Sequence, residues 1–332
     1  MMIRVAHIMC VVGFLAAAGT ARAEWSATLL PLAGKVTRVR QVGGDVYIKA
    51  ESWLQVSICD HGELCFKPKR PPAEAEPAGG IPDGKIASSG GRGVVRTWYS
   101  EPTDRYGHGV LGDRIEAGSL MAVDAAGRLY AMSLGPGSVF EDLTPRLADM
   151  DGDGMAEIAT IRSRLDGGAA LAIYGLRNGQ LEEIGATDPL GRPNRWLNIA
   201  GIADFTGDGR LDIALIKTPH IGGRLEIWTF RSGSLARVAS AGGFSNHVIG
   251  STELGLSAIA DIDGDGTPEL ALPDAGRTEL RILTVRDGVI DQRAAVAVGG
   301  RITTAIGVLK TPEGPIFVMG LEDGRAIAIR RN

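Results

Sequence analysis

Residues 149–157 read Asp149-Met-Asp151-Gly-Asp153-Gly-Met-Ala-Glu157. The same arrangement of acids and glycines returns at residues 204–212 and 261–269, so the three copies start 55 and 57 residues apart. Carboxylates at alternate positions let a tight turn fold around one cation, and the glycine at the sixth position supplies the backbone angle that the turn needs. All-oxygen ligation suits a hard divalent ion, and a flexible loop favours Ca²⁺ over Mg²⁺. The repetition predicts one structural unit used several times.

Short alternating segments follow each acidic loop and predict β-strands. Each unit contains a two-residue turn of the type X-Gly, at residues 178–179, 232–233 and 287–288. Such a dipeptide between alternating segments is a hairpin signal. Four antiparallel strands repeated at a period of about 50 to 60 residues are typical of β-propeller blades. An EF-hand does not fit, because its twelfth position must be Glu and here it is Thr160, Leu215 and Leu272.

The predicted fold is therefore an all-β propeller of four-stranded antiparallel blades. Weaker copies of the unit, without the acids, lie at residues 114–127 and 303–324. Counting them gives six blades, with five or seven as alternatives, and a linear β-solenoid is a further alternative with usually shorter repeats. The last unit lacks its outer strand, so we expect the N-terminal segment 26–31 to supply it and close the ring. A single domain over residues 24–332 is predicted, with a long Pro/Gly-rich surface loop at about 67–106.

The first 23 residues have the pattern of a secretory signal. Arg4 is followed by an apolar run over residues 8–18 and by a small-residue cleavage site, Ala21-Arg-Ala23. Without residues 1–23, which carry Arg4 and Arg22 and no acids, the 35 basic and 39 acidic residues become 33 and 39, a net charge of −6. This acidity argues against nucleic acid as a partner, and no later apolar run is long enough to cross a membrane. We expect a periplasmic or secreted protein.

Two cysteines remain in the mature chain, Cys59 and Cys65. Asp-His-Gly between them reads as a hairpin turn that brings the two sulfurs together. In an oxidising compartment they should form a disulfide. The alternative is a metal site that uses His61, although few soft ligands lie nearby.

The acidic loops, set in strand units of this length, resemble the FG-GAP or VCBS repeat, the blade of integrin-α-type propellers. The resemblance covers roughly residues 147–290 and implies up to three Ca²⁺ ions, each held by positions 1, 3, 5 and 9 and by the carbonyl of position 7. The implied ligands are Asp149, Asp151, Asp153, Met155 and Glu157; Asp204, Thr206, Asp208, Arg210 and Asp212; and Asp261, Asp263, Asp265, Thr267 and Glu269. Thr206 departs from the pattern, so we expect the middle loop to bind most weakly. The ions are expected to be structural, because unneutralised carboxylates repel one another.

If the acidic loops join the first and second strands of each unit, the opposite face is formed by other loops. These loops carry Tyr106, His108, Arg192, Asn194, Arg195, Trp196, His220, Asn246, His247 and Glu253. Loops on a rigid scaffold are where binding residues usually lie.

Three hypotheses compete for that face. The first is a module that binds an unknown protein or glycan, with Tyr106 and Trp196 as contact surfaces. The second is a carbohydrate-active enzyme, a polysaccharide lyase or hydrolase that uses a histidine or Glu253 as acid or base; histidines gathered there could also ligate a transition metal. The third is purely structural, with Trp196 packed under its loop and each histidine bonded to a carbonyl. Common catalytic motifs are absent from the sequence, which favours the binding module.

Overall fold

The computed structural model describes residues 24–59 and 62–332. The predicted signal peptide, residues 1–23, lies outside the described residues, as do Asp60 and His61 of the predicted hairpin turn. The described residues form 25 β-strands and no α-helix, and none of them belongs to a helix with the length and apolar character that crossing a bilayer requires. The all-β prediction is confirmed.

Four sheets have four antiparallel strands each, in the orders β2-β3-β4-β5, β15-β16-β17-β18, β19-β20-β21-β22 and β1-β25-β24-β23. Their bounds are β1 (Trp25–Leu29), β2 (Arg38–Val42), β3 (Asp45–Lys49), β4 (Trp53–Ile58), β5 (Leu64–Pro68), β15 (Leu197–Ala203), β16 (Asp212–Lys217), β17 (Arg224–Arg231), β18 (Ser234–Gly242), β19 (Ala258–Ala260), β20 (Glu269–Pro273), β21 (Glu279–Arg286), β22 (Val289–Ala297), β23 (Gly307–Thr311), β24 (Gly314–Gly320) and β25 (Ala326–Arg331). Each sheet is a hairpin meander, as expected for propeller blades.

A fifth sheet has nine strands and contains two further four-stranded units. One unit comprises β6 (Ala87–Ser88), β7 (Arg92–Thr103), β8 (Glu116–Asp124) and β9 (Leu129–Ser133). The other comprises β11 (Arg146–Ala148), β12 (Met155–Arg164), β13 (Gly168–Arg177) and β14 (Gln180–Ala186). Strand β10 (Ser138–Phe140) pairs with both β8 and β12 and joins the two units. Sheets and blades therefore do not correspond one to one, and the blade number stays a prediction.

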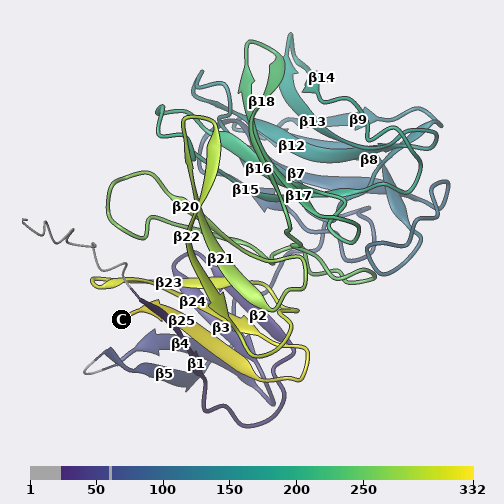
Figure 1. The fold of residues 1–332 in the computed structure, drawn as a ribbon. Helices are drawn as coiled ribbons and strands as arrows, with labels where there is room; N and C mark the ends of the chain where they lie inside the picture. The colour runs from purple at the N-terminus through teal and green to yellow at the C-terminus, as the bar shows by residue number, and fades with distance from the viewer. Residues whose placement is uncertain (1–23, 60–61) are drawn as a thin grey trace, which may run out of the picture.

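The N-terminal strand completes the last sheet, as predicted. Strand β1 runs antiparallel to β25, from Trp25 opposite Arg331 to Leu29 opposite Ile327. Figure 1 shows the purple N-terminal strands beside the yellow C-terminal ones. Backbone hydrogen bonds thus join the two ends of the described chain, so the last blade gains the outer strand that its own sequence lacks.

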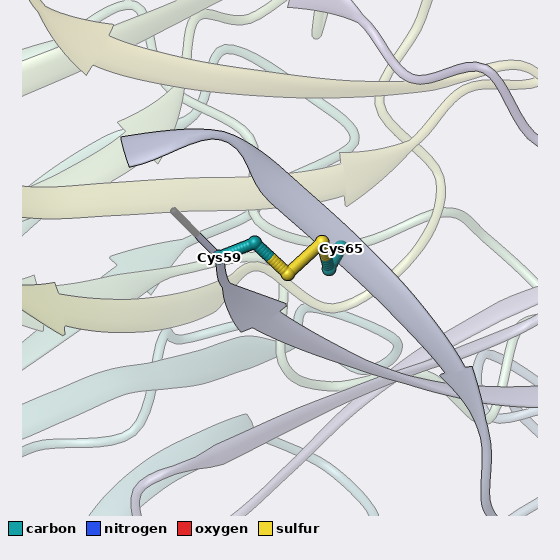
Figure 2. The surroundings of a disulfide bond; sticks show 2 residues. All are labelled: Cys59 and Cys65. Atoms are coloured by element: carbon teal, nitrogen blue, oxygen red, sulfur yellow. A yellow bond between two sulfur atoms is a disulfide. The ribbon is translucent and has the colours of Figure 1, made fainter. Parts of the chain in front are cut away.

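The Cys59–Cys65 disulfide is present, which confirms the predicted bond (Figure 2). Cys65 lies in β5 opposite Ser57 of β4, and the Cys59 amide donates to the Glu63 carbonyl over 2.8 Å. This pairing places the two Cα atoms 5.8 Å apart, within the range that a disulfide spans. The bond therefore fastens the end of the β4–β5 hairpin.

The predicted long surface loop at about residues 67–106 is interrupted by a long strand. Strand β7 spans Arg92–Thr103 within the predicted surface loop, because its β-branched and aromatic residues pair along β8 despite the glycines and prolines around them. The weaker copy of the unit at residues 114–127 contains strand β8. Gly118 in this strand allows close packing, since a Cβ there would lie 3.1 Å from the Glu101 carboxyl carbon.

Four clusters of buried apolar side chains hold neighbouring sheets together. One packs β2–β5 against the last sheet, and another lies within and between the units β6–β9 and β11–β14 and the sheet β15–β18. Among the described residues, none of the four clusters includes both β2–β5 and β6–β9. Ion pairs occur there instead, since Glu74 contacts both Arg40 and Lys85. This seam differs from the apolar contacts elsewhere in the fold.

Candidate metal loops and the opposite loop face

The three acidic loops lie between the first and second strands of three successive units, β11–β12, β15–β16 and β19–β20. In the first loop, the Asp149 carboxylate accepts hydrogen bonds from the amides of Gly152 and Gly154 at 2.8 and 2.9 Å. The third loop repeats this arrangement, with Asp261 accepting from Gly264 and Gly266. These glycines have positive φ angles between 78° and 87°, a region that favours glycine. The motif thus folds its loop the same way in both units.

In all three loops, the acid at position nine has one buried carboxylate oxygen that is available to bind a cation. In the first loop, Glu157 Oε2 accepts from the Met150 amide at 2.9 Å, whereas Glu157 Oε1 is buried and accepts no hydrogen bond from the described residues. The corresponding oxygens of Asp212 and Glu269 are also buried and unpartnered. Burial and the nearby aspartates raise the pKa of Glu157 to about 7. A buried carboxylate oxygen without a donor is costly, so a bound cation suits this position.

The remaining acids make the first and third loops better suited to bind a cation than the middle loop. Ligand oxygens of Asp149, Asp151 and Glu157 can lie within 4.8 Å of one another, and the same holds for Asp261, Asp263 and Asp265. In the middle loop, the Thr206 hydroxyl donates to Asp212 Oδ2 at 2.9 Å. A hydroxyl supplies no negative charge, so this loop offers a cation less electrostatic attraction. The ligand sets, including the carbonyls of Met155, Arg210 and Thr267, stay a prediction.

An arginine at the end of the third strand faces each acidic loop, a regularity that the sequence reading missed. Arg177 Nη2 lies 3.3 Å from Asp151 Oδ2 and 3.8 Å from Glu157 Oε1. Arg231 lies 3.2 Å from Asp208, and Arg286 lies 3.5 Å from Asp265. Each arginine directly precedes an X-Gly turn, so its spacing could have been recognised. The arginines partly neutralise the loops.

The loops with irregular sequences lie at the other end of the strands. Because neighbouring strands are antiparallel, the loops 104–115, 187–196, 218–223 and 243–257 lie opposite the acidic loops. We call this the loop face. It brings together His220, His247 and Trp196, whose rings lie within 6.0 Å of one another between centroids. Trp196 also connects to the His108 region, because its Nε1 donates to the Glu141 carbonyl at 2.9 Å.

The two histidines form a hydrogen-bond chain with one direction. His247 Nε2 lies 2.9 Å from the Ser251 carbonyl, which can only accept, so this nitrogen carries the proton. Burial lowers the pKa of His247 to about 3 and that of His220 to about 4, so both rings are neutral at neutral pH. His247 Nδ1 therefore accepts from His220 Nε2 over 2.9 Å. His220 Nδ1 is left as an acceptor with no protein partner among the described residues.

A second polar network surrounds His108. Its Nδ1 lies 2.5 Å from Glu141 Oε1, and the Ser163 hydroxyl donates to the other Glu141 oxygen. Glu141 is fully buried, whereas the His108 side chain is 16% exposed. Burial raises the pKa of Glu141, and the His108 hydrogen bond opposes that rise. For neighbouring Glu116, burial and then the charge of Glu141 raise the pKa to about 10, so this carboxyl is neutral at neutral pH.

Several predicted binding residues support the loop face from beneath. Trp196 and Tyr106 are 2% and 4% exposed, so the prediction that their rings are contact surfaces is corrected. Tyr106 instead accepts a hydrogen bond from the Asn194 amide at 2.8 Å. Packing under the loops leaves these rings no open surface in this structure.

The other predicted residues are distributed around this network. Arg192 and Asn194 are exposed, and the Arg195 guanidinium donates to the Asn194 carbonyl. Asn246 and His247 are fully buried, and Glu253 accepts from the Gly255 amide at 2.9 Å.

Sequence reasoning missed two buried polar residues near this face, Glu116 and Asn198. Asn198 Nδ2 donates to the carbonyls of Asn246 and Leu254, while its Oδ1 has no protein partner. Both side-chain atoms of Asn246 and Glu116 Oε2 are likewise buried and unpartnered. A single polar residue in an otherwise apolar strand, Leu-Asn-Ile-Ala at residues 197–200, was the available signal for Asn198.

Comparisons with known proteins agree with this architecture. The chain contains matches to the family described as FG-GAP-like repeat at residues 149–215 and 204–272, less than half of its length. A search of curated protein sequences found no match.

Solved structures that resemble the chain are β-propeller-like. The exotype rhamnogalacturonan lyase YesX is 17% identical with a TM-score of 0.40, covering 86% of this chain and 71% of the lyase. A rhamnogalacturonan lyase of Bacillus licheniformis is 15% identical with a TM-score of 0.45, covering 92% and 68%. A putative 6-phosphogluconolactonase of Bacteroides fragilis is 13% identical with a TM-score of 0.41, covering 90% and 79%. Similarity at this level says nothing of function. The four-stranded antiparallel sheets make the chain a β-propeller, and residues 149–272 of it match FG-GAP-like repeats.

Proposed function

We propose that this chain is an exported β-propeller, stabilised by calcium at its acidic loops, that binds a protein or glycan ligand at its loop face. Export to a periplasmic or extracellular location rests on the N-terminal signal pattern and is consistent with the disulfide. Calcium would be held by the acidic loops, where one carboxylate oxygen each of Glu157, Asp212 and Glu269 is buried without a hydrogen-bond donor among the described residues. Its contribution would be to neutralise carboxylates and tie strand ends together.

One observation carries the binding role: polar groups are buried without protein partners beneath the loop face. Asn246 is fully buried, and neither its amide nitrogen nor its oxygen has a hydrogen bond with any described residue. Asn198 adds a third such atom at the same place. Each buried polar atom without a hydrogen-bond partner lowers the stability of the fold by about 1–3 kcal/mol. A polar ligand or water that supplies the missing hydrogen bonds would therefore stabilise this region.

The exposed part of the loop face complements this buried layer. His220 Nδ1 is a neutral acceptor, and its ring is held by the His247 hydrogen bond and by parallel stacking on Trp196. Ile221 and Ile249, which are 63% and 67% exposed, lie on the same loops. A hydrogen-bond acceptor in a fixed position, His220 Nδ1, beside exposed apolar side chains suits a ligand that offers both hydroxyl groups and apolar surface, as sugars do.

Binding of the calcium-loaded mature protein to a panel of envelope polysaccharides and proteins tests this proposal. We expect saturable binding that is at least about tenfold weaker in His220→Ala, which removes the acceptor. Ser234→Ala is the matched control, because Ser234 is exposed on a strand that begins at the acidic-loop end. Lack of saturable binding to every panel member would contradict the proposal, as would equal binding by wild type and H220A.

A second candidate function is an enzyme that acts on carbohydrate. The observation in its favour is the His108–Glu141–Ser163 network, in which a buried carboxylate orients a partly exposed imidazole. Such a dyad can transfer protons in a lyase or hydrolase. Turnover of a polysaccharide by wild type, abolished in His108→Ala and retained in H220A, would favour the enzyme over the binding module.

A further inference from the structure

A cavity of about 430 Å³ lies among the first strands of several sheets. Its walls come from β2, β15, β19 and β23, each of which lies at one edge of its sheet, from the segment between β5 and β6, and from the segment between β18 and β19. A neighbouring cavity of about 370 Å³ shares Lys85, Ala200, Glu253, Gly255 and Ser257 with it. The two cavities are therefore adjacent, and we call them together the inner-strand cavity. Each has the size of a small-molecule site.

The larger part of this cavity is lined by more cations than anions. Arg38, Arg40, Lys85 and Lys310 contribute four positive groups, while Glu74 and Glu253 contribute two negative ones. The whole chain has a net charge of −4, so this excess of positive charge is local. A concave surface lined by one sign of charge concentrates ions of the opposite sign.

Two of the four cations have no carboxylate partner among the residues that the structure describes. Arg40 Nε and Lys85 Nζ both contact Glu74 Oε1, at 3.0 and 3.6 Å, and Arg40 also donates to the Pro72 carbonyl. Arg38 and Lys310 form no ion pair within the described residues, although both line the cavity and are exposed. These two side chains are free to bind an anion.

The cavity also offers acceptors for hydroxyl groups. Glu253 accepts from the Gly255 amide through Oε1 and has no cationic partner within the described residues. The Ser257 hydroxyl donates to the Ala200 carbonyl at 2.7 Å, which leaves its oxygen able to accept a further bond. Small residues on the walls, Ala200, Gly255 and Ala305, keep the space open.

We propose that the inner-strand cavity binds a hydroxylated anion, namely an acidic sugar unit. Arg38 and Lys310 bind its anionic group, and Glu253 and Ser257 accept from its hydroxyls. A carboxylate and a phosphate present the same chemistry to these cations. The proposal rests on the proposed binding function and narrows its ligand class. Glu253 links the two regions, because its amide donates to Ser251, whose carbonyl accepts from His247.

Calorimetric titration of the calcium-loaded mature protein tests this inference with three probes: D-glucuronate, glucose 6-phosphate and D-glucose. We expect at least one of the two anionic sugars to bind at least about tenfold more tightly than glucose, with affinity that falls as salt rises. Comparison of the two anionic sugars distinguishes a carboxylate ligand from a phosphate ligand. The double variant R38A/K310A should bind the anionic probe at least about tenfold more weakly than wild type. K67A/R70A is the matched control, because it removes the same charge at exposed positions outside the cavity.

The inference is overturned if glucose binds as tightly as both anionic sugars, if neither anionic sugar binds, or if R38A/K310A, shown to be folded by circular dichroism, binds like wild type. Failure can be separated from failure of the proposed function. If panel binding depends on His220 but neither anionic sugar binds, the cavity proposal is wrong and the loop-face proposal stands. If an anionic sugar binds and depends on Arg38 but no panel member binds, the loop-face proposal is wrong and the cavity proposal stands.

Discussion

The two ends of the strands in this propeller differ in how their loops are built. At one end, the acidic loops start 55 and 57 residues apart, and the first and third share the same hydrogen bonds. At the other end, loops such as 104–115, 218–223 and 243–257 differ in length and sequence. Their histidines and buried carboxyls nevertheless form connected networks. The repeated loops thus belong to the regular scaffold of the propeller, whereas the irregular loops carry the histidines and buried carboxyls.

The largest effect should come from removing a metal ligand in the regular loops. Glu157→Gln removes the negative charge of a buried acid whose Oε1 accepts no hydrogen bond from the described residues. In excess calcium, loss of the first site should lower the free energy of unfolding by about 2.7 kcal/mol at one hundred times the site's Kd. In EDTA the same variant should be at least as stable as wild type, because it buries no charge. Denaturant unfolding in both buffers measures this reversal, with exposed Glu76→Gln as the control; equal effects in both buffers would refute metal binding by this loop.

On the loop face, the largest effect should depend on pH and not on calcium. Burial raises the folded-state pKa of Glu116 from its ordinary value of 4.5 to about 10. The folded protein therefore keeps a proton that the unfolded chain releases, and this contribution to stability is complete below pH 4.5 and lost as pH rises toward 10. Glu116→Gln imitates the neutral carboxyl, so its stability relative to wild type should increase with each pH unit between pH 5 and 9, because only the folded wild-type chain keeps the Glu116 proton in that range. Unfolding curves at several pH values test this, and a difference that stays constant with pH would contradict it.

A smaller effect should distinguish the middle acidic loop from its neighbours. Thr206→Asp restores the carboxylate that the other two loops have at position three. Because calcium affinity rises with the number of charged ligands, we expect the middle site to bind about tenfold more tightly. Competition with a fluorescent chelator measures the change. Unchanged or weaker calcium binding would show that the loop already has its full ligand set.

The smallest effect should come from the arginines that face the acidic loops. Arg177 is partly exposed and lies 3.3 Å from Asp151, so its charge opposes a cation in the first loop only weakly. Arg177→Gln should raise calcium affinity there by about two- to fivefold, the size expected of a screened ion pair. Arg164→Gln is the control, since Arg164 pairs with exposed Asp166. Weaker calcium binding in R177Q would mean that the arginine organises the loop.

The regular part of the fold could be predicted from the sequence because its signals are local. Each acidic loop and X-Gly turn fixes a nearby strand end, and the missing outer strand of the last blade indicated ring closure by β1. The prediction failed where local composition conflicted with pairing. Strand β7 lies among glycines and prolines, yet its pairing with β8 decides its conformation.

The candidate site could be predicted only in part. Alternation of loops between the two ends of the strands placed His108, His220 and His247 on one face. The burial of Trp196 and Glu116 and the hydrogen bonds of Asn198 depend on contacts between segments far apart in the chain. The inner-strand cavity likewise combines Arg38 and Lys310, which lie near opposite ends of the chain. Such long-range contacts leave no local pattern to read.

Calorimetric unfolding of the mature protein in calcium and in EDTA tests most directly whether bound calcium stabilises the propeller. With calcium at one hundred times the Kd, each occupied loop should add about 2.7 kcal/mol to the free energy of unfolding. We expect a melting temperature that is higher by several degrees in calcium, because a gain of this size in a large domain moves the midpoint by about 2–4 °C per kcal/mol. The same melting temperature in calcium and in EDTA would show that calcium does not stabilise the fold.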